Sequence, residues 1–129
     1  MAIVIAISPQ TSAVAPVVDI VATSTDSVTN QIETAFSGYG QLRRICRCES
    51  NLTQFEKDGI TVLRGRENPK DLGICQINEF YHGEQAKKLG FDLYSLTGNV
   101  AYAKHLYERE GTKPWVWSEP CWRTVTQTP

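Results

Sequence analysis

One glutamate of the chain stands where its type and spacing suggest acid–base chemistry. In the stretch "RRICRCESNLTQF", residues 43–55, Glu49 follows Leu42, Ile45 and Cys46 at the spacing i, i+3, i+4 and i+7 of one helix face. This face predicts that Glu49 points toward the interior or a cleft. Because desolvation disfavours a charged carboxylate, it raises the pKa, and a carboxyl group protonated near neutral pH can act as a general acid. The alternative is that Glu49 has only a structural role and forms an ion pair with one of three nearby arginines: Arg43, Arg44 and Arg47.

A second polar cluster follows in the stretch "DLGICQIN", residues 71–78. We predict a short strand that places Leu72, Ile74, Gln76 and Asn78 on one side and Gly73, Cys75 and Ile77 on the other. Asp71, Gln76 and Asn78 then project from the strand and from the turn entering it. Each amide offers a donor and an acceptor, which suits sugar hydroxyls and N-acetyl groups. Gly73 leaves room for a substrate or the helix of Glu49 to approach closely. The alternative is a solvated polar edge strand.

These two motifs together carry a resemblance to a known superfamily. "CES" at the end of a helix, followed by the D-x-G-x-x-Q-I-N pattern of "DLGICQIN", resembles the lysozyme-like superfamily of animal lysozymes, soluble lytic transglycosylases and resuscitation-promoting factors. The later "GNVAYAKHLYEREG" looks like its packing helix and "PWVWSEPCW" like its closing segment, so the resemblance covers about residues 30–122. It implies an α+β, mostly helical fold with a small β-hairpin beside the catalytic helix.

The resemblance also implies roles for individual residues. Glu49 matches the catalytic acid, and Gln76 matches the glutamine that lines the substrate cleft. Asp71 stands where animal lysozymes carry a second carboxylate, which favours hydrolysis because many lytic transglycosylases lack it. Asn78 matches an asparagine of the lysozyme version of the motif, and Tyr102 falls near the aromatic that transglycosylases place beside the acid.

The substrate implied is the glycan of peptidoglycan, cut between N-acetylmuramic acid and N-acetylglucosamine. Glu49 would protonate the glycosidic oxygen, and Asp71 would act as nucleophile, charge stabiliser or base. Without an effective Asp71, the 6-hydroxyl of the sugar would close on its own ring, as in a lytic transglycosylase. Neither route needs a cofactor or a metal. Other carboxylates compete for the second role, namely Glu56, Asp58 and Glu67.

Aromatic side chains are candidates for stacking on sugar rings, namely Tyr81, Trp115, Trp117 and Trp122. We expect one or two of the tryptophans to lie in the core beside Cys121 instead. Three rival functions stay open: a non-catalytic glycan-binding module of the same fold, a cysteine-based redox or metal-binding protein, and a different glycanase, such as a chitinase. The C-x-C spacing beside a glutamate is poorly suited to the second.

Four cysteines permit two disulfides, which is typical of an oxidising compartment, secreted or periplasmic, at the cell wall. Buried free thiols are the alternative, and the C-x-C spacing of Cys46 and Cys48 does not fit a zinc knuckle. The resemblance implies a bridge between Cys48 and Cys121. Cys46 and Cys75 have no counterpart in it, so they either pair with each other or remain thiols.

The elements that must position these residues can be placed from caps and periodicity. We predict a first helix capped by Thr29 and a second over about 41–50. Short β pieces follow within 59–77, namely "ITVL" (60–63) and "GICQI" (73–77), and then a third helix over about 79–89. A fourth helix follows over about 97–109, with Thr97 as its cap, and ends before Gly111 and Pro114.

Length, charge and hydrophobicity limit the number of domains and the kinds of partner that we expect. The chain of 129 residues has room for one domain, and its net charge of −1 gives no sign of nucleic-acid binding. No stretch approaches the roughly 18 apolar residues that span a bilayer, and we expect a monomer. Residues 1–27 contain no Lys or Arg and are rich in Ala, Val, Ser and Thr, so we interpret them as a flexible tail with a targeting remnant, ahead of a catalytic domain over 28–129.

Overall fold

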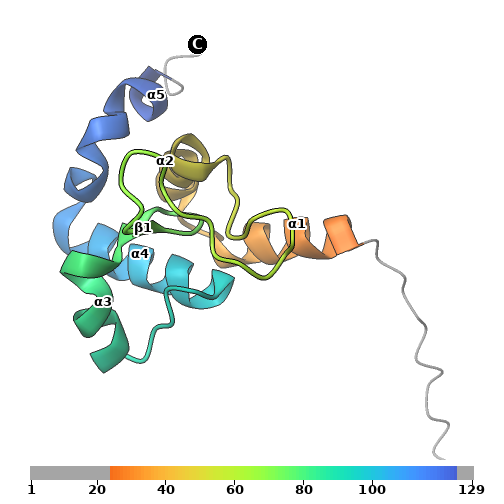
Figure 1. The fold of residues 1–129 in the computed structure, drawn as a ribbon. Coiled ribbons are helices and arrows are strands. Elements are labelled where there is room, and N and C mark those ends of the chain that lie inside the picture. Colours follow the sequence, from red (N-terminus) through yellow and green to blue (C-terminus); the bar gives the residue numbers. More distant parts are fainter. Residues whose placement is uncertain (1–23, 125–129) are drawn as a thin grey trace, which may run out of the picture.

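The computed structural model describes residues 24–124 and shows an α+β arrangement that is mostly helical (Figure 1). The elements follow in the order α1 (Ser24–Ala35), α2 (Gly40–Ser50), β1 (Asp71–Leu72), β2 (Ile77–Asn78), α3 (Glu79–Lys88), α4 (Leu96–Glu110), the 3₁₀ helix η1 (Lys113–Ser118) and α5 (Glu119–Thr124). This confirms the α+β, mostly helical part of the prediction. The core is formed by apolar residues of these helices, of the β1–β2 hairpin with its connection, and of two loops, which contribute Val62 and Leu93.

Helix α1 begins earlier than the sequence suggests. It starts at Ser24, so Thr29 lies inside the helix instead of capping it, and residues 24–27 belong to the helix and not to the predicted tail. The rest of that tail prediction, residues 1–23, lies outside the described residues. Ile32 and Phe36 are buried, as their helical spacing implies.

Helix α2 confirms the second predicted helix and its buried face. Leu42, Ile45 and Cys46 are each 0% exposed. The helix ends at Asn51, which adopts left-handed backbone angles (φ 57°) and donates its N–H to the Arg47 carbonyl. Glu49 therefore lies in the last turn of α2, on the same helix face as the buried residues Leu42, Ile45 and Cys46.

The sheet is smaller than predicted. Strands β1 and β2 form an antiparallel hairpin in which Asp71 pairs with Asn78 and Leu72 with Ile77. The predicted strand over 60–63 makes only an isolated bridge between Phe55 and Val62.

The predicted strand through "GICQI", residues 73–77, is wrong, because residues 73–76 form the connection between β1 and β2. Gly73 (φ +70°) and Gln76 (φ +50°) adopt left-handed backbone angles, which interrupt an extended chain. Ile74 and Cys75 are both 0% exposed, so the side chains do not alternate between two faces.

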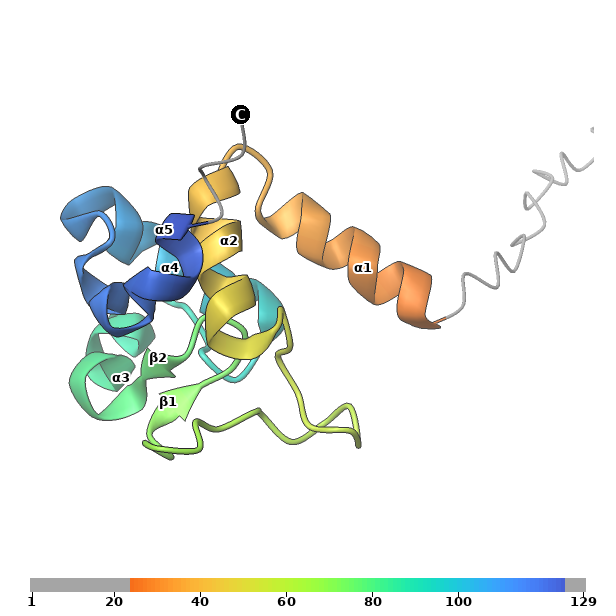
Figure 2. The ribbon, with the colours of Figure 1, turned by 90° about the horizontal axis from the view of Figure 1, so that it is seen from above.

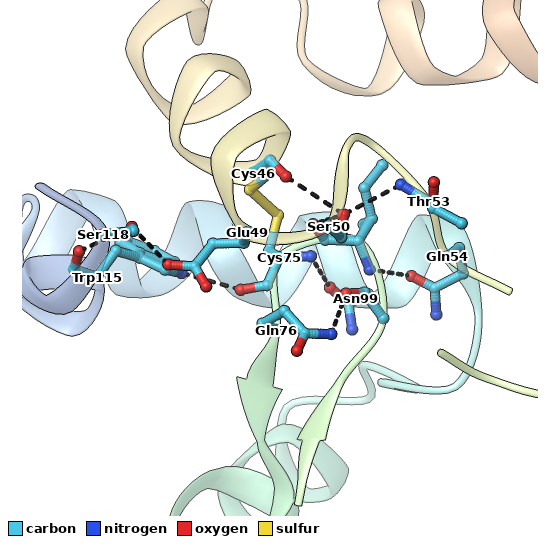
Figure 3. Close-up of a disulfide and its surroundings, with 12 residues drawn as sticks. Cys46, Glu49, Ser50, Thr53, Gln54, Cys75, Gln76, Asn99, Trp115 and Ser118 are labelled. Carbon is cyan, nitrogen blue, oxygen red and sulfur yellow. Dashed lines mark hydrogen bonds between the residues drawn. A yellow bond between two sulfur atoms is a disulfide. The ribbon is translucent and has the colours of Figure 1, made fainter. Parts of the chain in front are cut away.

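This connection is buried, and side chains from distant segments satisfy its backbone (Figure 3). Gln54 Oε1 accepts from Ile74 N at 2.9 Å, and Asn99 Oδ1 accepts from Cys75 N at 3.1 Å. Ser50 Oγ donates to the Ile74 carbonyl at 2.6 Å, and Trp115 Nε1 donates to the Cys75 carbonyl at 2.9 Å. The connection is thereby fixed to α2, α4 and η1.

Gly73 is required where the two buried amides meet. A Cβ atom at this position would lie 2.4 Å from Gln54 Oε1 and 2.6 Å from Asn99 Nδ2, and its φ of +70° is strained for other residues. The glycine thus makes room for these amides, and not for the substrate or the catalytic helix as we predicted.

Helices α3 and α4 confirm the next two predicted helices. Asn78 caps α3, since its side chain accepts from the Tyr81 N–H. Helix α4 is capped by Ser95, two residues before the predicted cap Thr97, and Gly111 follows its end. Within residues 24–124, no helix is both long and apolar enough to cross a membrane.

Two disulfides fasten α2 to other parts of the chain. Cys46 is bonded to Cys75 across 29 residues, and Cys48 to Cys121 across 73 residues. Both pairs agree with the pairings considered above, and the described residues contain no free cysteine. Figure 2 shows α5 beside α2, the arrangement that the second bridge holds. In the chain-entropy account, bridges over loops of this size each contribute about 3–5 kcal/mol.

Candidate active site

Glu49 lies at the junction of two adjoining pockets that form one cleft. The pockets have volumes of about 340 and 690 Å³, and both are lined by Glu49, Asn68, Asp71 and Gln76. The first pocket extends toward α3, α4 and η1, and its other lining residues are Ile77, Asn78, Tyr81, His82, Leu106, Pro114, Trp115 and Trp117. The second extends along the loop after α2, and its other lining residues are Cys48, Ser50, Thr53, Leu63, Arg64, Gly65, Arg66 and Glu67.

The surroundings of Glu49 favour its protonated form. Partial burial raises the pKa of the carboxyl group, and the negative charge of Asp71 raises it further, while a hydrogen bond from Ser118 acts in the opposite direction. The net effect is a pKa above the usual value. No salt bridge among the described residues includes Glu49, and Arg43 pairs with Glu33 at 2.7 Å instead.

Ser118 contacts the acid directly (Figure 3). Its Oγ donates to Glu49 Oε1 at 2.6 Å, lies 3.1 Å from the Trp115 carbonyl, and accepts from Trp122 Nε1 at 3.1 Å. A hydroxyl has one proton and two lone pairs. When Glu49 is neutral, Ser118 can therefore accept a hydrogen bond from the carboxyl O–H and donate one to the Trp115 carbonyl. When Glu49 is ionised, Ser118 can donate to the carboxylate, so it fits both protonation states.

Asp71 is held by the residue opposite it in the hairpin. Asn78 Nδ2 donates to Asp71 Oδ1 at 3.0 Å, while Asn78 Oδ1 accepts from Tyr81 N at 3.1 Å. Both ends of the Asn78 amide are thus used within the protein. These contacts position Asp71, and because Asn78 also lines the first pocket, its sugar-binding role stays a prediction.

Gln76 lies at the centre of the cleft, as predicted, but from a turn and not from a strand. Its Nε2 donates to the Gly73 carbonyl at 2.9 Å, which orients the side chain over its own turn.

Of the other carboxylates that competed with Asp71, Glu67 lines the second pocket, whereas Glu56 and Asp58 line neither. Asp58 instead accepts hydrogen bonds from Ile60 and Thr61 within its loop.

The aromatic residues divide between the cleft and the core. Trp117 and Tyr81 line the first pocket and are 94% and 75% exposed. Trp115 and Trp122 are buried, at 3% and 6% exposure, as expected for one or two of the tryptophans. The two exposed rings are thus available to a ligand in the cleft.

The prediction that Tyr102 lines the substrate site is wrong. Tyr102 is 1% exposed and lies in the core, because its face of α4 packs inward together with Ala103 and Leu106. Its hydroxyl instead contacts His82 Nδ1 at 3.0 Å.

Sequence reasoning missed His82 and Asn68, which line the cleft, and Ser118, which contacts Glu49. His82 lines the first pocket, and burial lowers its pKa, which favours the neutral imidazole. The signal for Ser118 was its place between tryptophans in the closing segment "PWVWSEPCW", although nothing there indicates contact with Glu49.

The described residues contain no group of three or more His, Cys, Asp or Glu side chains suited to hold a metal ion.

Searches with protein-family models, against curated proteins and against solved structures gave no match for this chain. The function is therefore inferred from the geometry of the site and from the resemblance of the motifs.

Proposed function

We propose that this chain is a peptidoglycan-cleaving glycosidase, a muramidase of the lysozyme-like superfamily, that cuts between N-acetylmuramic acid and N-acetylglucosamine. The observation that carries the proposal is the half-buried Glu49, whose pKa is raised, in a cleft that it shares with a second carboxylate, Asp71. Paired carboxylates in unlike environments are the usual equipment of glycosidases. The order of the motifs in the sequence supports the same reading.

In the first step, neutral Glu49 donates its proton to the glycosidic oxygen as the bond to the anomeric carbon breaks. The proton moves to the leaving sugar, which departs as an alcohol, and Glu49 becomes a carboxylate. The Ser118 hydroxyl then stabilises that carboxylate, since it already lies 2.6 Å from Oε1.

Asp71 acts on the cationic sugar that remains. Its carboxylate either bonds to the anomeric carbon, stabilises the positive charge, or activates water for attack. The hydrogen bond from Asn78 fixes one carboxylate oxygen, which leaves the other to face the sugar. Addition of water to the anomeric carbon yields a reducing end. The proton of that water passes to Glu49 when Asp71 has bonded to the sugar or stabilised its charge, and to Asp71 when Asp71 activates the water.

The two pockets provide room for sugars on both sides of the scissile bond. On the side toward η1, Trp117 and Tyr81 expose ring faces on which the apolar faces of sugars can stack. The two disulfides are typical of proteins in oxidising compartments. We therefore propose action outside the cytoplasm, at the cell wall.

The test is mass spectrometry of purified peptidoglycan digested with the wild type and with Glu49→Gln. We expect muropeptides with reducing ends from the wild type and a loss of at least about 10²-fold with the variant. Anhydro ends would identify a lytic transglycosylase, in which the 6-hydroxyl of the sugar replaces water. Binding to peptidoglycan without cleavage would identify a glycan-binding module, and cleavage of chitin alone would identify a chitinase.

A further inference from the structure

A third pocket is lined mainly by residues of α3 and of the segment that connects α3 to α4. Its volume is about 710 Å³. The residues that line it are Lys70, Glu79, Phe80, Gly83, Glu84, Lys87, Gly90, Phe91, Asp92, Leu93 and Tyr94. Tyr81 and His82 of the same helix line the cleft instead, so α3 separates the two sites.

One wall of the third pocket is an aromatic ring held in place by two charged residues. The Tyr94 hydroxyl donates to Glu79 Oε2 at 2.5 Å and accepts from Arg64 Nη2 at 3.3 Å. The Arg64 guanidinium also lies over the ring, 5.9 Å from its centroid. Tyr94 is nevertheless 46% exposed. A ring fixed in this way loses little conformational entropy when a ligand stacks on it.

A second ring connects this pocket to the cleft. Phe80 is 76% exposed, and its ring packs edge-to-face against Tyr81 with centroids 5.1 Å apart. Tyr81 lines the cleft and Phe80 lines the third pocket. The two exposed rings in contact therefore form one continuous aromatic surface that reaches both sites, and exposed apolar surface commonly marks a binding site.

The charged residues around the pocket favour a neutral polar ligand. Both signs are present: the cationic residues are Lys70 and Lys87, and the anionic residues are Glu79, Glu84 and Asp92. This balance gives no attraction for an anionic polymer or membrane surface. Carboxylates accept hydrogen bonds from hydroxyls and ammonium groups donate to them. Exposed rings combined with such groups suit a sugar chain.

We propose that the third pocket is a second carbohydrate-binding site, which takes β-1,4-linked N-acetylhexosamine oligosaccharides. The choice of this sugar rests on the proposed function, because the continuous aromatic surface would let one glycan strand contact both sites. Binding at the third pocket holds the polymer near the cleft and raises its effective concentration there. Phe80 and Tyr94 supply the stacking surface.

The test is an NMR titration of the full ¹⁵N-labelled chain carrying Glu49→Gln with the β-1,4-linked trimer of N-acetylglucosamine. Backbone amides of Gly83, Leu93 and Tyr94 report on the third pocket, and the Trp117 indole and Gln76 amide report on the cleft. Two variants address the third pocket. Phe80→Ala removes an exposed ring, and Gly83→Leu adds a side chain into the pocket, where its Cβ would meet nothing closer than Glu79 Cβ at 3.9 Å.

We expect both groups of signals to shift, and each variant to weaken affinity at the third pocket by at least about tenfold, with cleft affinity unchanged in Gly83→Leu. Unshifted third-pocket signals, or shifts that persist in both variants, would overturn the second site while leaving the proposed function intact. Shifts confined to the third pocket would support the second site and count against the proposed function.

Discussion

Ser118 Oγ lies 2.6 Å from Glu49 Oε1, a contact between residues 69 positions apart in the sequence. It joins the last turn of α2 to η1, and the disulfide between Cys48 and Cys121 ties α2 covalently to α5, the helix that directly follows η1. The acid is thus positioned by the C-terminal part of the domain. This hydrogen bond also limits how far burial raises the pKa of Glu49.

Ser118→Ala should therefore raise the pKa of Glu49 further, because the hydrogen bond that stabilises the carboxylate is lost. Activity needs protonated Glu49 and falls as pH rises through its pKa. The alkaline limb of the kcat/KM profile should move to higher pH, and kcat should fall about tenfold because the acid is less well oriented. Ser37→Ala, in an exposed turn, is the control. An alkaline limb that stays in place or moves to lower pH would show that Ser118 does not act on Glu49.

Variants of Asn78 should separate its capping role from its support of Asp71. Asn78→Ala should cost about 1 kcal/mol of unfolding free energy, because α3 loses its cap. Asn78→Ser should keep most of that stability, since serine caps helices comparably well and adds no charge opposite Asp71. Both variants lose the amide N–H that donates to Asp71, so both should lower kcat by about 10²-fold. Urea unfolding and steady-state kinetics measure the two effects, and full activity of Asn78→Ser would refute the positioning role.

Trp117→Ala should raise KM for glycan oligomers by about tenfold with little change in kcat, as expected for a ring that binds substrate and transition state equally. Because Trp117 is 94% exposed, the melting temperature should not change. Val116→Ala is a matched control, since Val116 is the adjacent exposed residue and does not line the cleft. Equal KM values for the wild type and Trp117→Ala would remove the tryptophan from the binding surface.

Asn99→Leu should destabilise the fold by about 3 kcal/mol, because the buried Leu72 carbonyl and Cys75 N–H both lose a hydrogen-bond partner. Asn30→Leu makes the same replacement at an exposed position of α1 and should change stability little. Urea denaturation with the disulfides intact measures both. A cost below about 1 kcal/mol for Asn99→Leu would mean that the turn can relax without its amide.

The sequence was most informative where a pattern is local. Helices α2, α3 and α4 were predicted to within a few residues, because periodicity and capping residues act over short distances. The orientation of Glu49 followed from the spacing of Leu42, Ile45 and Cys46 alone. The wrong position of Tyr102 arose from matching it to a family motif and not from its own helical face.

The hairpin connection could not be predicted for a physical reason. A buried turn such as 73–76 has the same apolar composition as a strand, and only its partners distinguish the two. Those partners, Gln54 and Asn99, lie 20 and 24 residues from the atoms that they bind. The contact of Ser118 with Glu49 was hidden in the same way, since no local pattern encodes it.

The most direct test of the proposed chemistry is an NMR pH titration of the Glu49 side-chain carboxyl carbon, assigned by its loss in Glu49→Gln. The account predicts titration above the ordinary glutamate value of 4.5, at the same pH as the alkaline limb of peptidoglycan cleavage by the free enzyme. Titration at or below 4.5, or an alkaline limb unrelated to it, would contradict the assignment of Glu49 as the proton donor.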